Sequence, residues 1–293
     1  MDSAIGLTRG NLIGSNAILS YLRMEYSSYT AIVHPGKGEK PHVGQVRFNI
    51  GEQFARLSFF APAEELDNRP LLALLDHLAW ECGNRHALRL IAEIDEDDPC
   101  FEAFRQAGFM VYARQRIWKI PASQQDTRNN EDNPWVTLNA ASQHALQNLY
   151  HVIVPPLVQG AEAMDKRPVH GLGYTQNGEL MAFVEVIHGP LGVFLLPVVH
   201  PNLRQPALLL EKLINQLPAL FGRPVYLAVR EYQSWLNSAA ESLHGEPSQQ
   251  KVLMVKHLAR QQRVGVTQTL RKVLENHGAE PSAPIIQHSK TKE

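Results

Sequence analysis

Three side chains that could bind a metal stand close together in the segment HLAWECGNRH: His77, Cys82 and His86. A structural zinc site usually takes four cysteine or histidine ligands at short, closed spacings. Three mixed residues around the expected end of a helix fit packing and capping better than a closed coordination shell. The sequence therefore predicts no metal site here.

Two other short motifs suggest chemistry but have simpler explanations. The acidic block DEDD at 95–98 precedes an expected helix, where carboxylates stabilise the helix dipole. Gly36-Lys37-Gly38 lies between expected strands and is typical of a hairpin turn. The chain has no Gly-x-Ser-x-Gly nucleophile elbow. No short motif by itself therefore points to a catalytic site.

The composition favours a soluble protein over a nucleic-acid-binding or membrane protein. The 293 residues carry 28 basic and 29 acidic side chains, so no excess positive charge is available for a phosphate backbone. Apolar runs such as GVFLLPVV are too short to span a bilayer, and the N-terminus lacks an apolar signal-peptide core. Cys82 and Cys100 do not make a disulfide framework. We expect a cytoplasmic protein.

The first half of the chain reads as a strand pair followed by alternating helices and strands. Apolar residues at strand and helix spacing predict strands at 42–49 and 53–62, a helix at 71–83 closed by glycine, a strand at 86–94, a helix at 98–108 and a strand at 109–120. This order predicts a mixed α/β sheet flanked by helices.

The second half repeats that order. It predicts strands at 179–189 and 192–201, a helix at 207–222, a strand at 223–230, a helix at 232–245 and a strand at 249–259. Gly83 and Gly222 are 139 positions apart, and Gly108 and Gly245 are 137 apart. A nearly constant offset indicates an internal duplication.

The polar segment at 122–134 has no apolar period and is the best linker in the chain. It predicts an N-terminal domain at 1–121 and a C-terminal domain at 135–260. The remaining residues, 261–293, contain one possible short helix and little core material, so we expect a mobile tail.

The element order resembles that of the GNAT superfamily of acyl-CoA-dependent N-acetyltransferases. The segment AFRQAGF at 103–109 is similar to the family's last motif, a helix that ends in Gly-Phe before the next strand. The segment from Leu71 to Ile94 is similar to the preceding motif. The resemblance covers most of residues 29–120 and, more weakly, 135–260. It implies two tandem GNAT-like domains, each a mostly antiparallel or mixed sheet with flanking helices.

The resemblance implies an acyl-CoA site that the first half does not supply. GNAT enzymes bind the pyrophosphate with a glycine-rich turn that enters the long helix, because glycine lets backbone N–H groups approach the anion. The matching segment here, EELDNRP at 64–70, has three acidic side chains and no glycine. We expect the first half not to bind acyl-CoA.

The matching turn of the second half is a weaker departure from the family's pattern. The segment PNLRQPA at 201–207 has no acidic residue, and Arg204 is compatible with a phosphate. It also lacks glycine, and Pro206 removes one N–H donor. If acyl-CoA binds anywhere, the resemblance places it on Arg204, Gln205 and Ala207.

The family's catalytic positions are also altered. Many GNAT enzymes use a tyrosine four residues before the helix-ending glycine as general acid, and that position is Phe104 in one half and Glu241 in the other. Tyr112 and Tyr232 are nearby in the sequence, but the motif does not place them. The general base is commonly a strand carboxylate, for which the candidates are Glu185 and, as alternatives, His188 and His200.

The segment LYHVIVPPLVQ at 149–159 has two possible roles. It lies where GNAT-like domains border the substrate cleft, so it could line a pocket, and its apolar spacing also fits ordinary helix packing.

Two functions follow from the resemblance and its departures. The first is a GNAT-like binding or interaction module with degenerate acyl-CoA sites, whose partner is a small molecule or a protein. The alternative is an active N-acyltransferase with one catalytic half, for which the resemblance favours the C-terminal half, acting on a small amine.

Overall fold

A computed structural model of the chain describes residues 2–10, 26–34, 41–61, 68–121, 133–164, 171–217 and 222–258. Four predicted features fall largely or wholly outside these ranges: the linker at 122–134, the tail at 261–293, the turn at 36–38 and the acidic turn at 64–67. No helix in the described ranges is long and apolar enough to cross a membrane.

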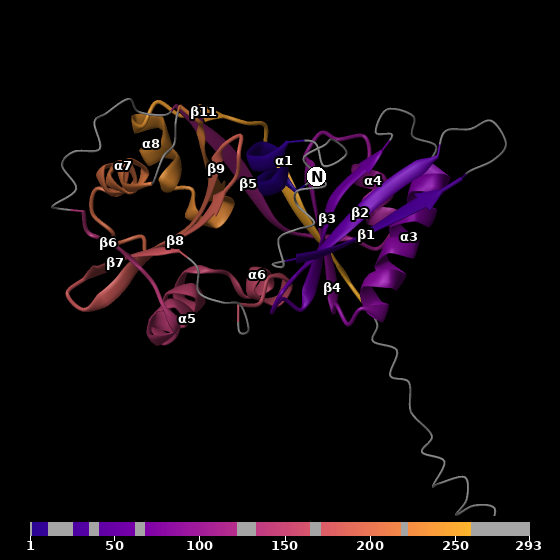
Figure 1. Cartoon of the computed structure of the whole chain (residues 1–293), viewed down its shortest axis with the longest axis horizontal. Coiled ribbons are helices and arrows are strands. Elements are labelled where there is room, and N and C mark those ends of the chain that lie inside the picture. The colour runs from indigo at the N-terminus through magenta and orange to yellow at the C-terminus, as the bar shows by residue number, and fades with distance from the viewer. Residues whose placement is uncertain are drawn as a thin grey trace, which may run out of the picture. The chain divides into compact units, whose positions relative to one another are not determined.

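The first half begins with a short helix and a strand that the sequence did not predict, and continues with the predicted order of elements (Figure 1). They are α1 (Ser3–Arg9), β1 (Tyr26–Val33), β2 (His42–Asn49), β3 (Phe54–Ala61), α3 (Asn68–Asn84), β4 (Arg89–Asp95), α4 (Phe101–Gln106) and β5 (Met110–Ile120). The boundaries agree with the sequence pattern to within a few residues, as expected where apolar periodicity is strong.

The second half adds two helices before its strand pair. Its elements are β6 (Trp135–Thr137), α5 (Gln143–Ile153), α6 (Pro156–Ala161), β7 (Leu172–Gln176), β8 (Glu179–His188), β9 (Val193–Val199), α7 (Pro206–Gln216), β10 (Val225–Arg230), α8 (Leu236–Ser242), β11 (Glu246–Pro247) and β12 (Lys251–His257). The elements β9-α7-β10-α8 follow the order of β3-α3-β4-α4. The internal duplication itself stays an inference from the sequence.

All these strands form one sheet in the order β1-β2-β3-β4-β12-β5-β10-β9-β8-β7-β6, with β11 paired to β5. Most neighbours are antiparallel, and two pairs, β3 with β4 and β9 with β10, are parallel. The predicted fold class, a mixed α/β sheet flanked by helices, is confirmed by this sheet.

The two halves exchange strands at the centre of the sheet. Strand β12 of the second half lies between β4 and β5 of the first half, where Figure 1 shows it as an orange-yellow strand among purple ones. In return, β5 pairs with both β10 and β11 of the second half. Each half therefore contributes one strand that pairs with strands of the other half.

Both parallel pairs separate after three residues. Strand β3 pairs with β4 from Phe54↔Arg89 to Arg56↔Ile91, and both strands then continue without pairing to each other. Strand β9 pairs with β10 only as far as Leu195↔Leu227. We call these places the first split and the second split. A separation of parallel strands exposes backbone donors and acceptors that need partners.

The sheet is covered on both faces. On one face Leu74, Leu75 and Leu78 of α3 belong to a core with alternate residues of β4. On the other face, residues of α5 and α6 such as Tyr150 and Val158 pack against Ile91, the intervening β4 residue that belongs to this second core. The middle of β4, Leu90–Ala92, is therefore an unbroken apolar run, as expected for a strand buried on both faces.

One predicted helix end differs from the structure. Gly83 was expected to close α3, but the helix continues through it to Asn84, and His86 takes the left-handed conformation with φ 67°. The N–H groups of His86 and Ala87 return to the carbonyl oxygens of Gly83 and Cys82 at 3.0 Å. This bond pattern closes a helix regardless of which residue adopts positive φ, so the glycine was a misleading signal.

Candidate functional site: a charged cavity between the exchanged strands

A cavity of about 120 Å³, partly open to solvent, lies on the face of the sheet that α1, α5 and α6 cover. Both splits contribute residues to it. Nine of the described lining residues are titratable: Asp2, Arg56, Glu93, Tyr112, Tyr150, Glu162, Glu185, Arg230 and Tyr232. Such a concentration of ionisable groups in one concave site is typical of ligand-binding or catalytic sites.

A β-bulge in β5 brings two polar side chains to the same side of this cavity. The register of β5 on β12 shifts between Leu253↔Ala113 and Met254↔Val111, so Tyr112 has no residue opposite it. Without the bulge, Tyr112 and Gln115 would face opposite sides of the sheet because they are three residues apart. The extra residue re-aims the strand, and both residues line the cavity.

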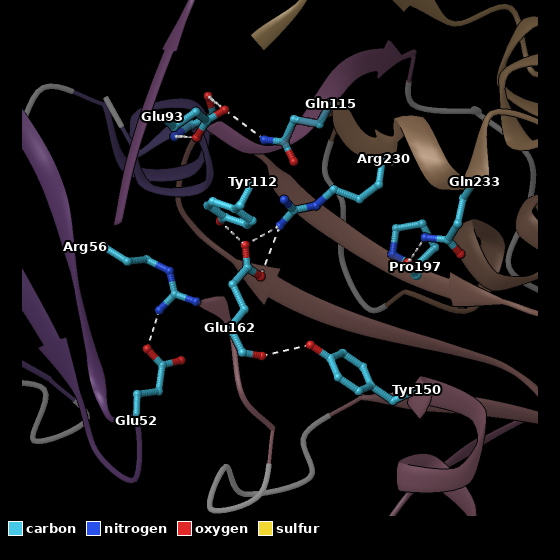
Figure 2. Close-up of polar contacts among 11 residues, drawn as sticks. Glu52, Arg56, Glu93, Tyr112, Gln115, Tyr150, Glu162, Pro197, Arg230 and Gln233 are labelled. Carbon is cyan, nitrogen blue, oxygen red and sulfur yellow. Dashed lines mark hydrogen bonds and ion pairs between the residues drawn. The ribbon is translucent and has the colours of Figure 1, made fainter. Parts of the chain in front are cut away.

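Glu162, just after α6, is the centre of the polar contacts in Figure 2. Its carboxylate accepts hydrogen bonds from the Tyr112 hydroxyl and from Nη2 of Arg230, the latter at 3.0 and 3.2 Å. Its backbone oxygen accepts a hydrogen bond from the Tyr150 hydroxyl at 2.8 Å. These contacts tie the segment after α6 to β5, β10 and α5.

The electrostatic interactions in this cluster keep Arg230 charged and the Tyr112 phenol neutral. Burial alone would lower the pKa of Arg230, but Glu162, together with Tyr112, Tyr232 and Glu93, outweighs it and raises that pKa above its ordinary value. Burial, reinforced by Glu162, raises the pKa of Tyr112 well above the usual range. Arg230 and Glu162 therefore form an ion pair. The Tyr112 hydroxyl donates a hydrogen bond to Glu162 and stays protonated.

A second guanidinium, that of Arg56, lies in the cavity wall on β3. It pairs with Glu52, four residues earlier, and stacks over the ring of Phe54 at 4.5 Å. Burial would lower the pKa of Arg56, but Glu52 and further carboxylates raise it instead. This arginine is therefore charged at any physiological pH.

Helix α1 occupies the first split. The N–H of Asp2 donates to the carbonyl oxygen of Ser58 on β3 at 3.1 Å. On β4, the Glu93 carboxylate accepts from the Ser3 N–H at 2.9 Å and from the Ser3 hydroxyl at 2.6 Å. The Asp2 carboxylate pairs with Arg47 at 2.9 Å. The chain's own N-terminal segment thus bridges the separated strands.

A single side chain occupies the second split. Gln233 is fully buried. Its Nε2 donates to the carbonyl oxygen of Pro197 at 2.9 Å, and its Oε1 accepts from the N–H of Val199 at 2.8 Å. The amide therefore imitates a backbone partner for the end of β9, and Figure 2 shows its contact with Pro197.

Of the three proton acceptors predicted from the sequence, the structure brings only Glu185 to the cavity. His188 pairs with Val193 beside the β8–β9 turn, and His200 follows β9 at the other end of the same hairpin. Seven residues of strand separate these ends, roughly 20 Å. Burial, aided by Arg223, lowers the pKa of His188. Neither histidine is among the described residues that line the cavity.

The predicted cofactor residues lie at the start of α7, with Arg204 and Gln205 before the helix and Ala207 in its first turn. Arg204 is exposed, and Gln205 has left-handed backbone angles, φ 52° and ψ 55°. Pro206 is the first residue of the helix, and Ala207 packs against the core of the second half. None of these residues is among the described residues lining the cavity.

The positions that the family would use for a tyrosine acid carry no phenol in the structure either. Phe104 is fully buried and packs edge-on against Phe109 at 5.1 Å. Glu241 is exposed on α8. Tyr112 and Tyr232, which the sequence motif could not place, both line the cavity. Their position depends on the bulge in β5 and on the turn after β10, and neither feature has a strong sequence signal.

Two further predictions from the sequence can be located. The segment at 149–159 does both of the things considered for it, since Tyr150 and Val158 line the cavity and also belong to an apolar core. His77 accepts or donates a hydrogen bond with the Tyr29 hydroxyl at 2.9 Å. Within the described ranges, no three His, Cys, Asp or Glu side chains form a group that could hold a metal ion.

No family model matches this sequence, and no curated protein sequence matches it. Among solved structures, the chain is similar to a tandem GNAT protein from the clavulanic acid biosynthesis pathway, with 16% identity and a TM-score of 0.49 over 88% of this chain and 92% of that one. It is also similar to a GCN5-related N-acetyltransferase from Kribbella flavida, with 14% identity and a TM-score of 0.48 over 77% and 89% of the two chains.

A conserved protein of unknown function from Staphylococcus epidermidis gives 11% identity and a TM-score of 0.47 over 70% and 85%.

Proposed function

We propose that this chain is a GNAT-like binding protein whose acyl-CoA sites are degenerate and which does not transfer acyl groups. The observation that carries the proposal is the pair of hydrogen bonds between the Gln233 amide and the end of β9. They occupy the backbone groups that the second split would otherwise offer to a ligand.

An extended ligand that contains amide groups can bind a separated strand by adding itself to the strand edge, as peptides do in β-augmentation. The arm of acyl-CoA has this character. At the second split, such an arm would have to displace Gln233 from Pro197 and Val199. The displaced amide is fully buried, and an unsatisfied buried amide costs about 1–3 kcal/mol. The residues present therefore do not fit the group.

The first split supports the same proposal. Its β3 edge is bonded to Asp2, and its β4 side holds Ser3 through Glu93. A ligand there would have to remove α1 from the sheet. Because the second half offers no better site, we regard binding in the central cavity as the function that the fold retains.

Titration of acetyl-CoA into the full chain by calorimetry tests the proposal. We expect no binding heat at acetyl-CoA concentrations up to about 1 mM, a range that would detect a complex of even about −4 kcal/mol. A micromolar dissociation constant would overturn the proposal.

One observation favours the alternative, an N-acyltransferase that acts on a small amine. Glu185 and Tyr232 both line the cavity beside the second split. A carboxylate could accept a proton from an ammonium group. Burial raises the pKa of Tyr232 to about 12, so the phenol keeps a proton that it could donate.

An assay for free thiol released from acetyl-CoA, in the presence of a panel of small amines, separates the two functions. Our proposal expects no release above the rate without protein. If release is found, Glu185→Gln should reduce it strongly, and Arg204→Ala should weaken acetyl-CoA affinity if Arg204, Gln205 and Ala207 hold the cofactor. Turnover that survives Arg204→Ala would remove that turn from the site.

A further inference from the structure

The central cavity carries a net negative charge. Its described lining has four carboxylates, those of Asp2, Glu93, Glu162 and Glu185, and two guanidinium groups, which leaves a charge of −2 at neutral pH. The next layer adds Arg47 beside Asp2 and Glu52 beside Arg56, and these two charges cancel. A concave site of this sign concentrates cations and repels anions.

Gln115 gives this cavity a fixed acceptor. Its Nε2 donates to the Glu93 carboxylate at 2.8 Å, so its amide orientation is set by a group that can only accept from it. Its Oε1 must then point elsewhere. That oxygen is buried and has no hydrogen-bond partner among the described residues, and the side chain is 3% exposed. A buried acceptor left in this state favours a ligand that donates.

Arg230 gives the cavity a fixed donor. Glu162 holds its Nη2, whereas its buried Nη1 has no hydrogen-bond partner in the described part of the chain. A guanidinium nitrogen cannot accept, so Nη1 calls for an oxygen acceptor. A carboxylate or carbonyl oxygen suits it, because hydrogen bonds from guanidinium groups are strong and directional.

We propose that the central cavity recognises a small basic amino acid or a close derivative of one. Its carboxylate or carbonyl oxygen accepts from Arg230 Nη1, and its α-ammonium group donates to Gln115 Oε1. A second positive group on the side chain offsets the excess of carboxylates. Apolar lining residues such as Phe183 and Leu253 cover the carbon chain. The inference rests on the proposed function only in taking the cavity as a binding site, and it requires no acyl-CoA.

Calorimetric titrations of the full chain with L-lysine, cadaverine and hexanoate test the proposal. Cadaverine is lysine without its carboxylate, and hexanoate keeps the carboxylate but has no amine. We expect L-lysine to bind about tenfold more tightly than cadaverine, since a hydrogen bond to a charged group is of that order. We expect no binding of hexanoate. Titrations with L-ornithine and L-arginine then show which length of side chain binds most tightly.

Two variants locate the ligand within the cavity. Gln115→Met removes the acceptor in a side chain of similar volume and should weaken L-lysine binding about tenfold. Gln216→Met is its matched control, because Gln216 on α7 also has a buried Oε1 without a hydrogen-bond partner among the described residues, but it does not line the cavity. The control should leave affinity unchanged.

Arg230→Lys tests the contact with the ligand's carboxylate. The measured quantity is the preference for L-lysine over cadaverine rather than the affinity for either ligand. The variant keeps a positive charge but removes the guanidinium fork, so the preference for L-lysine over cadaverine should fall from about tenfold to about equal. A variant that was only less stable would bind L-lysine and cadaverine more weakly by the same factor. If either variant fails to fold, the ligand series on the wild type decides alone.

Absence of binding for L-lysine, L-ornithine and L-arginine at about 10 mM, where affinities near −3 kcal/mol would still register, would overturn the inference and indicate that water fills the cavity. Hexanoate binding as tight as that of L-lysine would also overturn it. Neither result bears on the proposed loss of acyl-CoA binding, which acetyl-CoA titration tests separately.

Discussion

Gln233 shows how one buried side chain can satisfy the backbone groups of a separated strand. The sheet opens between β9 and β10, and a buried backbone N–H and C=O would be left without partners there. The amide of Gln233 supplies one acceptor and one donor at the right spacing. A residue that completes a strand edge in this way stabilises the protein and also removes a binding surface.

We predict that Gln233→Leu destabilises the chain by about 2–4 kcal/mol, because the backbone groups of Pro197 and Val199 would stay buried without partners. Urea denaturation measures the change. Gln106→Leu is the control, since Gln106 is exposed at the end of α4, and should change stability by less than about 0.5 kcal/mol. Equal effects of the two variants would contradict the role given to Gln233.

Tyr232 makes stability depend on pH at the alkaline end. Burial, with Glu162 adding to it and Arg230 opposing it, raises the pKa of Tyr232 to about 12. The unfolded chain releases this proton near the ordinary value of about 10. The folded state therefore holds a proton that the unfolded state has lost, so stability is complete below pH 10 and falls as pH rises toward 12.

We predict that Tyr232→Phe loses less stability than the wild type between pH 10 and pH 12, because its ring has no proton to release. Denaturation midpoints measured at several pH values across this window check the slope. Tyr226→Phe, in which the altered phenol belongs to a residue outside the central cavity, is the comparison. A wild-type stability that rises with pH in this window would contradict the sign.

At the scale of elements, α1 connects the two halves. Its first residues bind the separated strands β3 and β4, and the carbonyl oxygen of Thr8 near its end accepts from the Leu191 N–H at 2.9 Å, in the β8–β9 turn. Gly189 in that turn lies so close that a Cβ there would overlap the carbonyl group of Thr8. A seven-residue helix holds its place through these contacts, since so short a helix is not stable alone.

We predict opposite effects for two glycine-to-alanine changes around α1. Gly189→Ala should destabilise the chain by about 1–3 kcal/mol, because the added methyl group forces α1 away from the turn. Gly6→Ala, within α1, meets no atom within 4 Å and should stabilise by about 0.5–1 kcal/mol through helix propensity.

Hydrogen exchange of the α1 amides reports the same two changes locally. Faster exchange in Gly189→Ala and slower exchange in Gly6→Ala are the expected results. Unchanged exchange in both variants would mean that the turn does not hold α1.

At the scale of the whole molecule, the exchange of β5 and β12 makes the two halves depend on each other. Without β12, strands β4 and β5 have no common neighbour, and two long apolar edges would meet water. The strands predicted at 109–120 and 249–259 lie side by side at the centre of one sheet. Residues 1–260 form one compact unit.

We predict a single cooperative unfolding transition, because neither half keeps a complete sheet when the other unfolds. Differential scanning calorimetry should give one heat-absorption peak. A fragment of residues 1–121 should lack a folded circular dichroism spectrum alone and gain one when mixed with residues 133–260. Two resolved peaks, or an independently folded fragment, would contradict this prediction.

The sequence predicted most elements because their apolar spacing is strong. The run HALRLIAEI gave β4, and the Gly108 that closes α4 has the positive φ of 84° that its position requires. The end of α3 was wrong because the residue in the left-handed conformation is His86, not the nearby glycine. The departures at Phe104 and Glu241 were visible in the sequence, because a missing phenol needs no structure to be seen.

Only the tertiary structure decided how those elements make a site. Exchange of β5 with β12, the bulge at Tyr112 and the closure of the splits by Ser3 and Gln233 all depend on contacts between residues far apart in the chain. The sequence by itself determined the kinds of element, their order and the departures from the GNAT motifs that it resembles, because these depend on local spacing. The presence of Glu185 in the same cavity as Arg230 and Tyr112 depends on long-range packing, which no local pattern encodes.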